Sequence, residues 1–109
     1  MSVRYVVKPR GLLDLDVHAR YLLERASLEI ALRFLDNAHE TFALLASQPN
    51  MGWRSRTKHP GLEELRVFRI DRFEKMLVLY RPIPARIEIL RVIDGSHKLR
   101  SLLRREGLE

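Results

Sequence analysis

The sequence lacks cysteine and long apolar runs, two features that are common in extracellular and membrane proteins. It has no cysteine, so disulfides and thiolate metal sites are excluded, which fits a reducing compartment. It has no run of about 18 apolar residues, so no membrane-spanning helix is expected. The short apolar segment near the N-terminus is interrupted by Lys8 and Arg10, which argues against a signal peptide. We therefore expect a cytoplasmic protein that does not contact a membrane.

Negative charge is also scarce. The 109 residues include 20 Lys and Arg against 14 Asp and Glu, a net charge of +6. Sixteen of these cations are arginines, whose planar guanidinium suits bidentate contacts to phosphate or carboxylate. Apolar residues make up 46 % of the chain, too many for a disordered polypeptide. We expect one domain over residues 1–109, with a surface that favours anionic partners.

The first part of the chain indicates a strand followed by a helix. Ser2–Lys8 alternates and is rich in β-branched residues, which predicts a strand. Pro9 and Gly11 are expected to end it. Apolar residues then recur at helical spacing over Leu12–Arg25, and acidic residues such as Asp14 are expected in the first turn, where they complement the helix dipole.

A second, longer helix follows almost at once. Ser27 is expected to be its N-cap, and Pro49 is expected to stop it. Since only one or two residues separate the helices, the two should fold back as a hairpin on one face of a sheet.

The rest of the chain predicts the sheet itself. Gly52–Gly61 lacks periodicity and should be a basic loop, and Ser96–Arg105 should be a short basic helix or a tail that orders on a partner. Between them, Leu65–Ile70, Lys75–Tyr80 and Arg86–Ile93 read as three strands. The predicted fold is α+β: an N-terminal strand, a helical hairpin, then a three-stranded antiparallel meander in one small twisted sheet. A hairpin on one face would leave part of the opposite face open as an apolar patch for a partner.

The basic loop could form an anion-binding ridge. Arg54, Arg56 and Lys58 alternate, so an extended loop would send all three side chains the same way. Trp53 is available for stacking, although we favour an ordinary solvated residue there. The alternative is that the whole ridge is an ordinary solvated loop. We slightly favour electrostatic contact with an anion over this alternative.

Arg91 has two readings. By strand alternation it shares a face with Ile89 and Ile93, so it could be a half-buried cation paired with Asp94 or Glu88. Equally, it could present its charge at the end of the sheet to a phosphate or to a partner's carboxylate. The sequence leaves both readings open.

Several phrases of the chain, in this order, resemble a known family. They are Asp14-Leu15 with Tyr21-Leu22, Ala31-Leu32-Arg33-Phe34, Leu45-Ala46 with Pro49 through Gly52 and Arg54, Leu65-Arg66, Leu79-Tyr80-Arg81-Pro82, and Ile87 through Ile93 with Gly95. Together they cover nearly the whole chain. The sequence resembles the RelE/ParE superfamily of bacterial toxins from type II toxin–antitoxin pairs, and its ParE branch in particular.

The resemblance implies a RelE-like fold and a cognate antitoxin. Such an antitoxin is expected to be of ribbon-helix-helix type and to wrap the toxin with an acidic-apolar C-terminal segment. ParE-like members are associated with poisoning DNA gyrase, which implies growth inhibition and a role in stress response. RelE-like members cut messenger RNA on the ribosome. A degenerate relative that survives as a non-toxic binding module is the third possibility.

A ribonuclease of this fold would need cations for the scissile phosphate and groups that move protons. The candidates are Arg54, Arg56, Lys58, Arg66, Arg91 and His97. His97 stands where relatives commonly carry arginine, and Leu99–Glu109 holds neither the Tyr nor the His that ribonuclease-type relatives place there. We therefore favour a polar corner residue for His97 and binding over catalysis.

The remaining expectations concern partners and cofactors. Arg100 and Arg104, with the candidates above, are expected to contact an anion or a protein partner. No metal-ligand spacing, Gly-rich phosphate loop or nucleophile elbow occurs, so no metal and no cofactor is expected.

Overall fold

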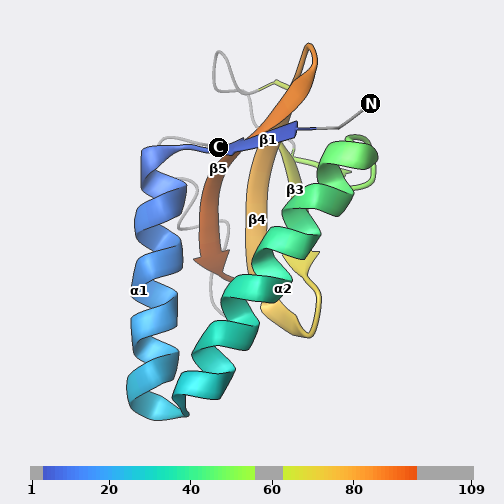
Figure 1. Ribbon diagram of the computed structural model, residues 1–109. Coiled ribbons are helices and arrows are strands. Elements are labelled where there is room, and N and C mark those ends of the chain that lie inside the picture. The colour runs from blue at the N-terminus through green and yellow to red at the C-terminus, as the bar shows by residue number, and fades with distance from the viewer. Residues whose placement is uncertain (1–3, 56–62, 96–109) are drawn as a thin grey trace.

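The computed structural model describes residues 4–55 and 63–95. They form a sheet with two helices lying across one face, as Figure 1 shows. The elements are β1 (Arg4–Val7), α1 (Pro9–Arg25), α2 (Leu28–Ser47), β2 (Trp53–Arg54), β3 (Arg66–Ile70), β4 (Phe73–Ile83) and β5 (Arg86–Asp94). The predicted α+β class, the helical hairpin and the three-stranded meander are confirmed.

The sheet has five strands in the order β1-β5-β4-β3-β2. β1 runs parallel to β5, whereas the other neighbours are antiparallel. The chain therefore leaves β1, passes through both helices and returns to the sheet at the opposite edge, in β2. β2 was not predicted: it pairs only Trp53 with Val67 and Arg54 with Arg66, and two residues are too few for an alternating pattern to reveal.

The start of α1 differs from the prediction. The strand ends before Pro9, as predicted, but Pro9 also begins the helix, three residues before the predicted start at Leu12. Proline fits there because the first-turn N–H groups of a helix have no internal partner and proline lacks that N–H. With the start moved, the first turn contains no acidic residue, and Asp14 lies in the second turn. Gly11 is buried at this corner, where a Cβ atom would lie 3.2 Å from the carbonyl oxygen of Ile89. The corner between β1 and α1 thus packs closely on β5.

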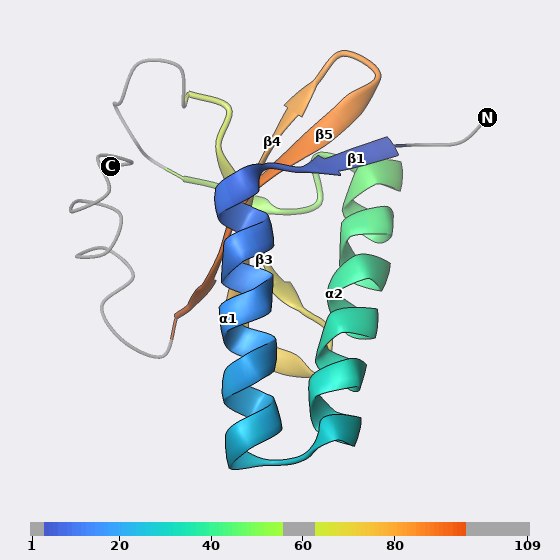
Figure 2. The same ribbon diagram turned by 60° about the vertical axis from the view of Figure 1, so that its left-hand side comes forward.

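The second helix begins as predicted. The Oγ atom of Ser27 accepts a 3.1 Å hydrogen bond from the backbone N–H of Ile30, which satisfies a free donor of the first turn. The turn of residues 26–27 makes the two helices a hairpin, and Figure 2 shows them side by side.

The main core lies between α2 and the sheet. Phe34 and Phe42 of α2 are fully buried against Tyr80, Ile87 and Ile89. Burying a side chain of this size stabilises the fold by roughly 1.5–3 kcal/mol. This cluster fixes the hairpin on one face of the sheet.

The other face of the sheet is not an open apolar patch at its centre. Leu65, Val67, Leu79 and Ile93 form a second cluster, and each is at most 4 % exposed. The prediction of an open apolar docking surface is therefore wrong for these four residues. They form one buried cluster, and Leu77 and Leu90 pack against it.

The β4–β5 hairpin departs from simple alternation. β4 continues to Ile83, three residues beyond the predicted end. The register shifts near its middle, so that Leu79 lies opposite Arg91 but Tyr80 lies opposite Ile89. The extra residue moves Ile89 and Ile93 to opposite faces. The prediction that Arg91 shares a face with both is wrong for this reason.

Candidate functional site

Three of the predicted site residues lie in the described part of the chain: Arg54, Arg66 and Arg91. The others lie outside the described residues: Arg56, Lys58, His97, Arg100 and Arg104. Arg54 and Arg66 are direct partners across β2 and β3, whereas Arg91 lies on β5, and the side chain of each of the three arginines bonds a different group.

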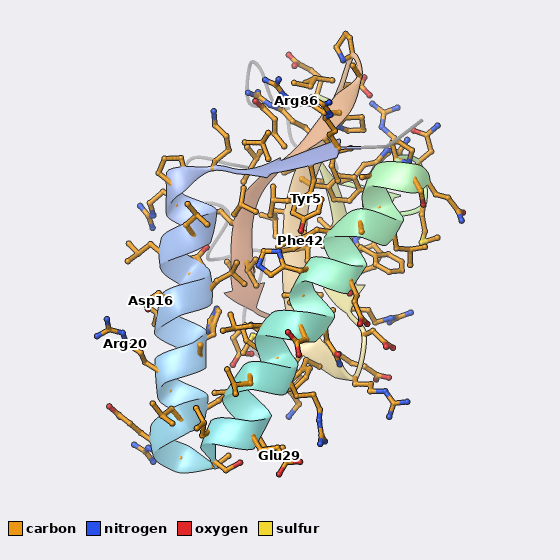
Figure 3. The ribbon with its side chains drawn as sticks, in the orientation of Figure 1. Tyr5, Asp16, Arg20, Glu29, Phe42 and Arg86 are labelled. Atoms are coloured by element: carbon orange, nitrogen blue, oxygen red, sulfur yellow. The ribbon has the colours of Figure 1, made fainter. Side chains whose placement is uncertain are left out.

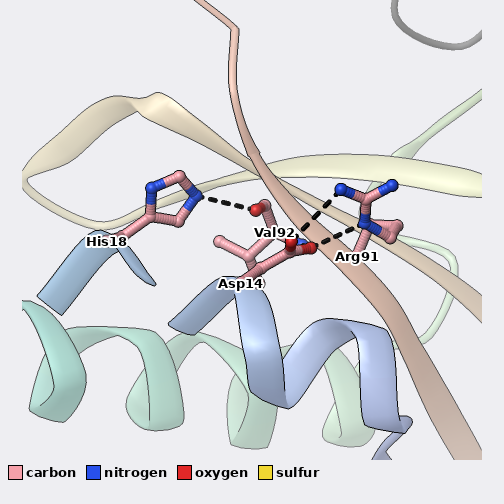
Figure 4. A network of polar contacts seen from close by, with 4 residues as sticks. All are labelled: Asp14, His18, Arg91 and Val92. Carbon is pink, nitrogen blue, oxygen red and sulfur yellow. Dashed lines mark hydrogen bonds and ion pairs between the residues drawn. The ribbon is translucent and has the colours of Figure 1, made fainter. Parts of the chain in front are cut away.

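Arg91 forms a bidentate ion pair with Asp14 of α1. Its Nε atom lies 2.7 Å from Oδ2 of Asp14, and its Nη2 atom lies 3.1 Å from Oδ1 (Figure 4). The two side chains are only 13 % and 12 % exposed. The interpretation of Arg91 as a half-buried cation in an ion pair is therefore correct. Its partner is Asp14 of α1, whereas the sequence suggested Asp94 or Glu88.

This ion pair is part of a clamp on the edge of β5. β1 pairs with β5 only as far as Ile89, so in the described part of the chain the next residues of β5 have no neighbouring strand on that side. Asp14 accepts a 2.9 Å hydrogen bond from the N–H of Val92, and Nε2 of His18 lies 2.9 Å from the carbonyl oxygen of Val92, to which it donates (Figure 4). Two side chains of α1 thus satisfy backbone groups that a strand would otherwise bond.

Arg66 and Tyr80 hold the turn that follows α2. Nη1 of Arg66 donates to the carbonyl oxygen of Gly52 at 2.7 Å. The Tyr80 hydroxyl donates to the carbonyl oxygen of Pro49 at 2.8 Å and accepts from the N–H of Gly52 at 2.9 Å. Burial raises the pKa of Tyr80 above its ordinary value, so the phenol stays protonated and can donate. Arg66 is engaged in the fold here.

Arg54 is the most accessible of the three. Its Nη2 atom donates to the carbonyl oxygen of Glu63 at 3.0 Å and lies 3.6 Å from Oε1 of Glu64. Both charged side chains are more than half exposed, so this pair adds little to stability. The guanidinium remains at the surface, and the anion-binding ridge stays a prediction.

The sequence reasoning missed a group of charges at the other end of the sheet. We call it the cation cluster: Lys8, Arg81 and Arg86, which form ion pairs with Glu88, together with Arg4, the strand partner of Arg86. Arg81 Nε bonds Oε1 of Glu88 at 2.8 Å, while Lys8 Nζ and Arg86 Nη2 lie 3.8 Å and 3.9 Å from Oε2. The Glu88 side chain is only 8 % exposed. The hydrogen bond from Arg81, together with the surrounding charges, lowers the pKa of Glu88.

Strand pairing explains how the cation cluster forms. Glu88 lies between Ile87 and Ile89, which face the helices, so its side chain points to the opposite face. Arg81 is its antiparallel partner on β4, and Arg4 is the parallel partner of Arg86 across β1 and β5. Figure 3 shows Arg86 at the end of the sheet, far from the Asp16–Arg20 pair midway along α1. Alternation within β4 and β5 could have revealed half of the cluster, but the parallel pairing of β1 could not be read from the sequence.

Among the described residues, most of the large apolar side chains that are exposed lie on the helical hairpin. Leu12 and Leu23 on α1, and Leu28 and Leu32 on α2, are between 48 % and 60 % exposed. No helix in the described ranges is long and apolar enough to cross a membrane. An apolar surface of this kind on a charged protein is typical of a site for another protein.

Groups that could bind a metal or move protons are dispersed. In residues 4–55 and 63–95, no three His, Asp or Glu side chains gather as a metal site. His39 Nδ1 lies 2.8 Å from the Tyr5 hydroxyl, and His18 bonds β5, so both described histidines are engaged in packing contacts. A groove of about 450 Å³ lies beside α2 and the β3–β4 turn, lined by residues of both charge signs such as Glu40 and Arg69.

One comparison with known proteins identifies a family, and a second shows the same fold. The model for the ParE toxin of the type II toxin–antitoxin system parDE matches residues 5–99. A solved structure of the chromosomal ParDE TA system from P. aeruginosa superposes with a TM-score of 0.68 and 21 % identity, over 86 % of this chain and 95 % of that chain. At this identity the structural likeness shows the fold. No curated protein matches the sequence.

Proposed function

The chain belongs to the ParE toxin family of type II toxin–antitoxin systems, and from this premise we propose that it inhibits bacterial growth by binding DNA gyrase. The observation that carries the proposal is the family match over residues 5–99, which includes both helices and the whole sheet core. The structural likeness to a ParDE protein supports the same fold. A role in stress response would follow from conditional release of the toxin.

The bonding of the described arginines favours binding over catalysis. A metal-free ribonuclease needs cations that are free to hold the scissile phosphate. Arg91 is instead paired with Asp14, and Arg66 donates to backbone carbonyl oxygens of the turn after α2. Two of the six ribonuclease candidates therefore stabilise the fold. Fewer cations remain that could hold a scissile phosphate.

Supercoiling of relaxed plasmid by purified gyrase tests the proposed target. We expect saturating toxin to abolish supercoiling, while relaxation by a type I topoisomerase in the same buffer continues. Unchanged supercoiling at saturating toxin rejects the gyrase proposal. Ribosome-dependent transcript cleavage on expression would instead indicate an mRNA interferase, and normal growth without antitoxin would indicate a non-toxic binding module.

We further propose that a cognate antitoxin silences the toxin through an acidic-apolar segment. The exposed leucines of the hairpin offer it an apolar surface, and the net charge of +6 favours an acidic partner. Leu28 and Leu32 lie one turn apart on α2 and are 60 % and 52 % exposed. A segment that orders against such a surface buries its own apolar side chains there.

Escape from neutralisation tests this surface. We expect the double variant Leu28→Ser/Leu32→Ser to stay toxic but to escape an antitoxin that neutralises the natural protein, because exposed leucines contribute little to folding. Leu44→Ser, also on α2 and 42 % exposed, is the matched control and should still be neutralised. Full neutralisation of the double variant would rule out this face as the antitoxin surface.

A further inference from the structure

In the cation cluster, several cations share one carboxylate. Three cations, Lys8, Arg81 and Arg86, form ion pairs with the single carboxylate of Glu88, and Arg4 is the strand partner of Arg86, so among the described residues the cluster holds more cations than carboxylates. The carboxylate is largely buried, whereas the Lys8 and Arg86 side chains are 44 % and 47 % exposed. The excess charge therefore faces solvent.

Two of these cations keep their hydrogen-bonding capacity. A charge-assisted N–H···O bond spans about 2.7–2.9 Å. Arg81 meets that distance to Glu88 at 2.8 Å, but Lys8 and Arg86 lie 3.8 Å and 3.9 Å from the carboxylate. They are held near the carboxylate by charge without being hydrogen-bonded to it. An incoming anion could accept from both without breaking the bond that Arg81 makes.

Arg4 and Arg86 are a like-charge pair in register. They are direct neighbours across the parallel strands β1 and β5, so their side chains leave the same face of the sheet. Like charges placed opposite each other destabilise a sheet. A bound anion between them would turn this repulsion into two attractions.

We propose that the cation cluster binds phosphate groups of a nucleic-acid backbone. The inference goes beyond the proposed function and does not depend on gyrase being the target. Cations that converge from three strands suit a compact anion such as phosphate, which accepts from several donors at once. The guanidinium forks of Arg4 and Arg86 match its geometry.

The surroundings favour nucleic acid over an acidic protein segment. Protein interfaces have an apolar, aromatic-rich centre, whereas nucleic-acid interfaces are more polar and strongly positive. Val6 is 41 % exposed between Arg4 and Lys8, but the larger group of exposed apolar side chains lies on the helices. The chain thus separates an apolar surface on the hairpin from a cationic surface on the opposite face of the sheet.

Salt-dependent DNA binding tests the proposal directly. Fluorescence anisotropy of a labelled mixed-sequence duplex is measured over a series of NaCl concentrations for the natural protein, Arg86→Gln and Arg69→Gln. Arg69 is an exposed arginine on β3, so its variant makes the same change of net charge away from the cluster. We expect Arg86→Gln to flatten the slope of log K against log salt by about one, and Arg69→Gln to leave the slope unchanged. Equal loss in both variants overturns the proposal, as does binding of a polyglutamate peptide without binding of DNA.

Thermal unfolding in phosphate keeps the test independent of DNA. Inorganic phosphate is compared with chloride at equal ionic strength, and Arg69→Gln reports the general stabilising effect of phosphate on proteins. We expect phosphate to raise the Tm of the natural protein and of Arg69→Gln more than that of Arg86→Gln. An equal phosphate-induced rise in all three proteins refutes the site.

Discussion

Replacing Arg91 by methionine separates the structural role of this arginine from a role in the toxin's action. Methionine keeps much of the side-chain length but leaves the carboxylate of Asp14 without its ion-pair partner. Removing one partner of a buried pair costs roughly 3–5 kcal/mol. Both side chains retain slight exposure, 13 % and 12 %, and Asp14 keeps the N–H of Val92, so we expect the lower end of this range, about 3 kcal/mol.

Urea unfolding measures this cost. With an m-value of roughly 1.5–2 kcal/mol/M, a loss of about 3 kcal/mol lowers the unfolding midpoint by about 1.5–2 M. Asp14→Ala should cost at least as much, because it also leaves the N–H of Val92 without its acceptor. In the double variant the two costs should not add, since the second change removes a charge that the first had already left unpaired.

The same variants show whether Arg91 also acts on the target. Under conditions where Arg91→Met remains folded, we expect it to match the natural protein, per folded molecule, in the supercoiling assay that tests the proposed target. A variant that loses less than about 0.5 kcal/mol, which is the range of ordinary surface substitutions, would refute the structural reading. Additive costs in the double variant would refute the pairing itself.

Three further predictions concern the turn after α2 and the cation cluster. Tyr80→Phe should cost about 1–3 kcal/mol in urea unfolding, because the buried hydroxyl bonds both Pro49 and Gly52. Since the pKa of Tyr80 is raised above 10.0 in the fold, the unfolded chain ionises first, and stability should fall as pH rises past that value in the natural protein but less in the variant. Gly52→Ala should also destabilise, by about 1–3 kcal/mol, because the new Cβ would lie 2.6 Å from the Tyr80 hydroxyl and 2.8 Å from the carbonyl oxygen of Val67; unchanged stability in urea unfolding would contradict this close packing. The pKa of Glu88 lies below its ordinary 4.5, so the ionised carboxylate stabilises the fold above that pH, and this stabilisation is lost as the pH falls through the folded pKa. The Tm values of Glu88→Gln and of the natural protein should therefore converge as the pH is lowered. A difference in Tm that stays constant with pH would contradict this linkage.

Local patterns were enough to predict most of the elements. Helical spacing and the Ser27 cap identified the hairpin, because both signals lie within a few neighbouring residues. The runs of apolar residues identified β3, β4 and β5 for the same reason. Boundaries were less well predicted: Pro9 serves equally well as a strand breaker and as a first helical residue, and only the packing of the corner decides between them.

The site was harder to predict than the fold, because its contacts join distant parts of the chain. Arg91 meets Asp14 across 77 residues, so nearby Asp94 and Glu88 were the only partners that spacing could suggest. Arg66 bonds carbonyl oxygens, which every residue has and no sequence pattern marks. The register shift between β4 and β5 adds one residue to β5 after Ile89, so the side chains beyond it point to the opposite faces from those that strict alternation predicts.

The clamp between α1 and β5 also bears on how the chain folds during synthesis. β1 and α1 leave the ribosome before the rest of the sheet, yet the strand that receives them, β5, is the last described element. The helical hairpin can form early from local contacts, whereas the sheet edge must wait for a contact of high sequence separation, which slows folding. Nascent chains that end before residue 86 contain no partner for β1 and no Arg91 for Asp14. The native fold, and any activity that depends on it, therefore arises only after β5 has been made.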